Sequence, residues 1–155
     1  AQIQALLARC RDADPAETRI LLKRILLLGT YIKRSANLYF LSREYDCLPQ
    51  QELRLTIDEA VRVMTVCGTE CSVVYHTTKP MLSAEVARLF DLLKTVEEAT
   101  INELHSLFIS VSDSEMDLSV ECAADLSFLV SPNVTVKQED GLWLVRTMIG
   151  GWKDA

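Results

Sequence analysis

The sequence has no excess of positive charge, little glycine or proline, and no apolar run long enough for a membrane span. Lysine and arginine number 16 against 22 aspartates and glutamates, and the net charge of −6 argues against the basic surface of a general nucleic-acid-binding protein. The apolar stretch Ile20–Leu28 is interrupted by Lys23 and Arg24 and is too short to cross a bilayer. No repeat and no low-complexity tract is present. These absences favour an ordinary globular domain.

The cysteines also exclude a secreted, disulfide-bonded framework. They are five in number, which is odd, and no signal sequence precedes them, so we expect a reducing, cytoplasmic environment. Cys67, Cys71 and His76 lack a second pair of ligands, and we predict no metal site. The chain begins without Met and within a helical pattern, so we expect it to be part of a longer protein.

The most informative stretch runs from Asp14 to Tyr45. Asp14 is a helix N-cap, Pro15 suits the first helical position, and Glu17 stands where a capping box has an acid. The pattern predicts one helix of about 30 residues, roughly 45 Å long. Its apolar residues form two stripes, the first Leu21, Ile25, Leu28, Ile32 and Tyr39, the second Leu27, Tyr31, Leu38, Leu41 and Tyr45. Two apolar faces require two packing partners, unless this is simply the core helix of a helical domain.

One partner is the short amphipathic helix predicted before Arg11, which should form an antiparallel hairpin with the long one. The other partner is either a second chain or the domain that follows. The basic residues Lys33 and Arg34 are interpreted as a solvated helix face. Because Pro49 ends the helical region, we place a domain boundary there, with a hairpin at 1–48 and a second domain at 49–155.

The second domain alternates between strand and helix patterns. We predict two helices, one opened by a capping box at Thr56–Glu59 and one capped at Ser83–Glu85. The predicted strands are 51–55, 70–77, 105–111, 118–122, 134–136 and 142–146, with a short helical turn expected within 125–130. Trp143 is expected to anchor the sheet and Trp152 to face solvent. The fold class is therefore α+β, a helical hairpin followed by an α/β sandwich with its helices on one face.

Three stretches of this pattern match a known family. They are 51–61 with 68–73, 89–99 with 107–111, and 134–136 with 140–145. Together with the hairpin they resemble the cytoplasmic core of a sensor histidine kinase. In that family a dimerising hairpin precedes an ATPase domain of the gyrase, Hsp90, histidine kinase and MutL (GHKL, or Bergerat) superfamily. The resemblance implies a bacterial two-component signalling protein that binds ATP and Mg²⁺ and acts on a response regulator.

The chain departs from this family at its functional residues. The hairpin, 1–47, has no histidine to accept phosphate. The family's magnesium-binding asparagine falls on Glu97 or Ala99, and Asn102 lies about a turn too late. Asp125 occupies the place of the adenine-reading aspartate, but no glycine follows it and the glycine-rich lid is missing. The candidate ATP and Mg²⁺ residues, if the site survives, are therefore Glu97, Asn102 and Asp125.

These losses predict a degenerate kinase-like signalling domain, with no cofactor, that acts through dimerisation and protein contacts. The expected dimer interface is the first stripe (Leu21, Ile25, Leu28, Ile32, Tyr39). The expected partners are a second copy and a response regulator or other signalling protein. Membrane contact is expected only through an upstream region of a larger sensor. Three alternatives stay open: an atypical kinase that still binds ATP, a phosphotransferase whose acceptor lies upstream of Ala1, and an unrelated interaction domain.

Overall fold

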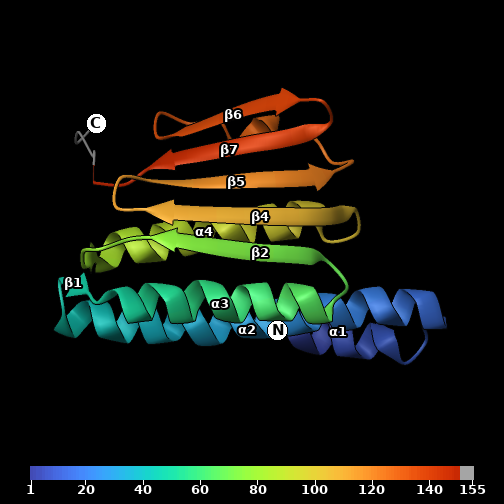
Figure 1. Cartoon of the computed structure of the whole chain (residues 1–155). Coiled ribbons are helices and arrows are strands. Elements are labelled where there is room, and N and C mark those ends of the chain that lie inside the picture. The colour runs from blue at the N-terminus through green and yellow to red at the C-terminus, as the bar shows by residue number, and fades with distance from the viewer. Residues whose placement is uncertain (151–155) are drawn as a thin grey trace.

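The computed structural model describes residues 1–150, and Trp152 lies outside them. Its helices are α1 (Gln2–Cys10), α2 (Pro15–Glu44), α3 (Gln50–Val66) and α4 (Ser83–Thr100), with a 3₁₀ turn η1 (Ser127–Leu129). Its strands are β1 (Cys47–Leu48), β2 (Glu70–His76), β3 (Met81–Leu82), β4 (Leu104–Ser112), β5 (Glu115–Cys122), β6 (Val134–Glu139) and β7 (Leu142–Met148). Helix α2 runs alongside both α1 and α3, and α4 lies behind the sheet (Figure 1). The predicted α+β class, a hairpin followed by a sandwich, is confirmed.

The main sheet has five strands in the order β2-β4-β5-β7-β6, of which only β2 and β4 pair in parallel. Buried and exposed residues alternate along the strands, and one row of residues across the sheet shows how the buried ones build the core. Val73, Ile109, Leu118, Val145 and Val136 stand opposite one another in register. The three central members are at most 1% exposed, because helices cover this face. The predicted strands from residue 70 onward are confirmed.

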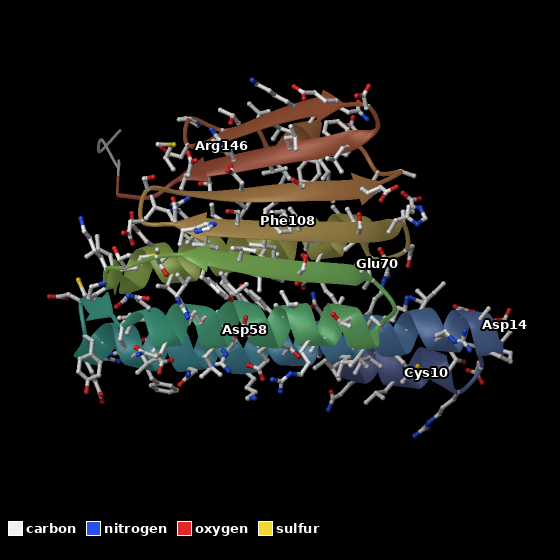
Figure 2. The ribbon with its side chains drawn as sticks, in the orientation of Figure 1. Cys10, Asp14, Asp58, Glu70, Phe108 and Arg146 are labelled. Atoms are coloured by element: carbon white, nitrogen blue, oxygen red, sulfur yellow. The ribbon has the colours of Figure 1, made fainter. Side chains whose placement is uncertain are left out.

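The long helix α2 begins as the sequence predicts. Asp14 Oδ1 accepts a hydrogen bond from the backbone N–H of Glu17 at 2.8 Å, and Pro15 is the first helical residue. The Glu17 carboxylate does not complete a capping box, since it pairs with Arg9 Nη2 at 3.2 Å. The bond between Arg9 and Glu17 therefore ties α1 to α2 near the hairpin turn, which projects beyond the end of the sheet (Figure 2, Asp14 and Cys10).

The second partner of α2 is the rest of the same chain. Leu38, 3% exposed, belongs to one core with residues of α3 and α4 such as Ile57 and Phe90. Arg34 is 5% exposed and donates from Nε to Glu59 of α3 at 2.9 Å. The interpretation of Arg34 as part of a solvated face is therefore wrong, because an acidic residue of the next helix compensates its burial.

The predicted strand at 51–55 is wrong, because these residues form the first turns of α3. Leu53 is 2% exposed while Leu55 is 51% exposed, a difference that the helix explains and a strand does not, because residues two apart share one face of a strand but lie on opposite sides of a helix. The capping box at Thr56–Glu59 is wrong for the same reason, and the Thr56 hydroxyl donates to the Glu52 carbonyl at 2.7 Å. The opening strand is instead β1, which pairs with β3.

Helix α4 begins at Ser83 as predicted, but Ser83 does not cap it. Its hydroxyl donates to the carbonyls of Tyr45 and Asp46, the latter at 3.1 Å. Ser83 is 4% exposed, and these bonds fasten the start of α4 to the segment that follows α2. They hold the hairpin and α4 in a fixed relation.

Candidate functional site

Glu97 lies on the side of α4 that faces the hairpin. It is 7% exposed, whereas its neighbour Glu98 is exposed. Burial, helped by the charge of Glu98, raises the pKa of Glu97 to about 8. Glu97 Oε1 has no hydrogen-bond partner among residues 1–150. Near neutral pH this group is therefore mostly an uncharged carboxyl with one unsatisfied oxygen.

Glu97 lines a cavity of about 390 Å³ between α1, α2 and α4. The cavity wall is mainly apolar and carries three basic side chains; its residues are Gln2, Ala5, Leu6, Arg9, Arg24, Leu27, Leu28, Tyr31, Lys94, Glu97, Glu98 and Ile101. A second cavity, of about 10 Å³, is also lined by Glu97, together with residues such as Met64 and Cys67. The volume of the larger cavity is within the range of small-molecule sites.

The other two candidate nucleotide residues lie elsewhere. Asn102 is exposed in the turn after α4. Asp125 is exposed before η1, where its Oδ1 accepts the backbone N–H of Ser127 at 2.8 Å, a bond that lowers the pKa of Asp125. Neither Asn102 nor Asp125 lines the two cavities that Glu97 lines. The structure does not gather the three around those cavities.

The connection between β5 and β6 occupies the place of the lid in the resembled family. It comprises residues 123–133 and contains no glycine. Leu126 is 0% exposed and Leu129 is 8% exposed, so both are anchored in the core. Ser131 pairs with Val134 in a β-bridge that closes the turn. This short segment is fixed to the core at two points, Leu126 and Leu129.

Only part of the predicted interface stripe on α2 is exposed and could contact a second copy. Leu21 is 2% exposed and lies inside the chain itself, and Ile25 and Leu28 are half-buried. Ile32 is 52% exposed and Tyr39 is 59% exposed. Four further apolar side chains of α2 are also exposed, namely Ile20, Leu22, Leu26 and Phe40. The second half of the helix therefore presents the larger free apolar surface.

Both histidines lie away from the hairpin. His76 ends β2 and His105 lies near the start of β4, and both are exposed. Within residues 1–150 no three His, Cys, Asp or Glu side chains are grouped so as to hold a metal. None of the helices described is both long and apolar enough to cross a membrane.

Sequence reasoning missed the polar contacts that fix the helices and loops. Arg34 meets Glu59, and Asp113 accepts two hydrogen bonds from Thr78, at 2.8 Å from its N–H and 2.6 Å from its hydroxyl. These bonds lower the pKa of Asp113. The paired residues are far apart along the chain, so no local pattern signals them. The cavity beside Glu97 was missed for the same reason, since three helices contribute to it.

No protein-family model and no curated protein sequence matches the chain significantly. Among solved structures, a bacterial phosphotransferase is similar over 93% of this chain and 85% of its own, with a TM-score of 0.52 and 9% identity. The histidine kinase AdeS of Acinetobacter baumannii matches with a TM-score of 0.42 and 14% identity, over 96% of this chain and 94% of its own. The cytoplasmic segment of histidine kinase QseC matches with a TM-score of 0.43 and 12% identity, over 87% of this chain and 95% of its own. At such identities the phosphotransferase likeness establishes the fold and no activity.

Proposed function

We propose that this chain is a histidine-kinase-like signalling domain without catalytic activity, which acts through dimerisation and protein contacts. Its hairpin, 1–48, pairs with a second copy, while the sandwich, 49–155, supports contacts with a response regulator or another signalling protein. It works in the cytoplasm as the terminal part of a larger sensor. The observation that carries this proposal is the β5–β6 connection.

A triphosphate is normally bound by backbone N–H groups of a glycine-rich segment that can approach it closely. Residues 123–133 contain no glycine, and Leu126 and Leu129 are committed to the core. The Asp125 carboxylate already accepts a backbone N–H of the same connection. These three facts support a domain that does not turn over ATP.

The surface of α2 supports the pairing of two copies. Ile32 and Tyr39 are seven residues apart, so they lie nearly on one line along the helix, and more than half of each is exposed. Apolar side chains exposed in a row on a helix are favoured positions for a second helix to pack. The proposed interface is therefore centred on Ile32 and Tyr39.

Two measurements test the proposal. Calorimetry with a non-hydrolysable ATP analogue and Mg²⁺ should give binding weaker than about 1 mM; a micromolar dissociation constant would refute the loss of the nucleotide site. Light scattering should show a dimer that the double variant Ile32→Lys, Tyr39→Lys converts to a monomer. The control Phe128→Lys changes a side chain that is 60% exposed on η1, and it should leave the dimer intact. A monomeric native chain would refute the pairing.

A phosphotransferase is the second candidate, because a structure of that description is similar in fold to this chain. This reading requires an acceptor upstream of Ala1, since 1–47 contains no histidine. Incubation with a phosphorylated response regulator, followed by detection of acid-labile phosphate, distinguishes the two. Acid-labile phosphate on a longer chain that includes residues before Ala1, and none on residues 1–155 alone, would favour the phosphotransferase reading. The leading proposal expects no transfer.

A further inference from the structure

The cavity beside Glu97 contains a polar group that the fold leaves unsatisfied. Buried side-chain oxygens in proteins nearly always have a hydrogen-bond partner, so Oε1 of Glu97 requires an explanation. The small cavity that Glu97 also lines, about 10 Å³, is at the lower limit of the space that one water needs. The larger cavity, about 390 Å³, offers far more room for a partner group. Because Oε1 itself is closed to solvent, a ligand in that cavity meets the Glu97 carboxyl at its other oxygen, which is accessible and has no hydrogen-bond partner among residues 1–150.

The charged residues around the cavity determine which sign of charge such a ligand should carry. Arg24 has no hydrogen bond or ion pair with another of residues 1–150, whereas Arg9 is paired with Glu17. Lys94 pairs with Glu98 at 3.1 Å, and its Nζ lies 4.1 Å from the centre of the Tyr31 ring. The lining therefore has an uncompensated positive charge at Arg24. It attracts an organic anion and repels an amine.

The rest of the cavity lining is apolar and favours a ligand with an apolar chain. Leu6, Leu27, Leu28 and Ile101 line the same cavity as Arg24 and Glu97. Gln2 and Arg9 on α1 also line the cavity and are exposed, so solvent reaches this part of its wall. A molecule that enters there can place an apolar chain on these leucines.

We propose that the cavity between α1, α2 and α4 binds a small amphipathic organic acid. Its anionic head pairs with Arg24, its apolar chain lies on Leu6, Leu27 and Leu28, and a hydroxyl or carbonyl group along the chain hydrogen-bonds Glu97. Such a ligand bridges the hairpin and α4, so its binding would bear on the relation between the two. This site does not depend on the proposed dimer or on the state of the nucleotide site.

Calorimetry on the intact chain at neutral pH, with three probes below their micelle-forming concentrations, tests the site. The probes are 3-hydroxydecanoate, decanoate and decylamine. We expect both acids to bind more tightly than the amine, and the hydroxy acid to bind most tightly because it alone reaches Glu97 with a polar group. Equal or tighter binding of decylamine, or no binding of either acid up to about 1 mM, would overturn the proposal.

Four variants assign the contacts. Arg24→Gln should weaken both acids about tenfold, as expected for a lost charge-assisted hydrogen bond, whereas the matched variant Arg62→Gln, on the exposed side of α3, should change neither. Glu97→Leu should weaken only 3-hydroxydecanoate, to the level of decanoate. Ala5→Trp should abolish binding by filling the cavity from α1. Equal effects of Arg24→Gln and Arg62→Gln, or undiminished binding to Ala5→Trp, would contradict the assigned site.

A second copy of the chain is the competing occupant of this cavity. If the partner protomer filled it, the affinity for 3-hydroxydecanoate would fall as the protein concentration rises into the range of the dimer. We expect an affinity that is independent of protein concentration. A decline would reassign the cavity to the dimer interface and overturn the ligand site.

Discussion

Glu97 should make the stability of this protein depend on pH in a characteristic way. The carboxyl has a pKa near 4.5 in an unfolded chain and about 8 in the folded one. Because the folded pKa is raised, the native state holds a proton that the unfolded state releases between these two values. The stabilisation is complete below about pH 4.5 and is lost as the pH rises to about 8.

The magnitude follows from the size of the shift. Each pH unit within the window lowers the free energy of unfolding by about 1.4 kcal/mol, which gives about 4 kcal/mol between pH 5 and pH 8. Glu97→Gln keeps the shape of the side chain and removes the titration. Relative to this variant, the native chain should lose about 4 kcal/mol over the same range.

Urea denaturation across that range, followed by far-UV circular dichroism, gives the free energy at each pH. Subtracting the free energy of unfolding of Glu97→Gln from that of the native chain at each pH removes the contribution of the other groups, which titrate equally in both. Glu44→Gln, at the exposed end of α2, controls for the loss of one negative charge. If the difference curve for Glu97→Gln were flat, the carboxyl would be ionised in the fold, and the argument that Glu97 is buried and uncharged would fail.

Three further substitutions test how the hairpin is held. Asp14→Ala should lower the free energy of unfolding by about 1 kcal/mol, because the N-cap hydrogen bond is lost. The control Asp12→Ala changes an exposed residue and should have little effect. Urea denaturation measures both. Leu38→Ala should cost about 2–5 kcal/mol, since Leu38 lies in the shared core, whereas Tyr39→Ala should change the stability of the monomer by less than about 0.5 kcal/mol in the same assay. Arg34→Ala leaves its acidic partner on α3 with one cation fewer and should lower the thermal midpoint measurably, with partial recovery in Arg34→Lys.

The strands after residue 70 could be predicted from the sequence because each has one buried and one exposed face. Alternation at Leu107, Ile109 and Val111 is such a signal, and the turn at Gly141 fixes the register of the last hairpin. The Asp140–Gly141 pair takes positive φ values of 50° and 83°, as such a hairpin turn requires. These are local properties of the chain, so the sequence alone contains them.

The segment at 51–55 shows where local reasoning fails. Leu53 and Leu55 alternate as in a strand, yet Gln50–Glu52 are good helix formers and Pro49 precedes them in an extended conformation. The decisive contact is long-range, because Leu53 packs in a core that Leu38 and Leu89 also occupy. The candidate site failed to be predicted for a related reason, since α1, α2 and α4 together create the surroundings of Glu97.

The packing around Glu97, more than its protonation, is the reason why we propose that it does not bind a metal–phosphate group. At neutral pH the ionisation of a group with a pKa of about 8 costs only about 1.4 kcal/mol, which a bound cation could easily offset. The hairpin is the stronger obstacle. Tyr31 of α2 donates to Asp91 of α4 at 2.9 Å, and its ring stacks on Phe90 at 5.5 Å between centres. A nucleotide centred on Glu97 would have to displace this packed helix, whereas a slender organic acid could enter beside it. The same contacts that argue against a kinase site thus leave the cavity that we assign to a different ligand.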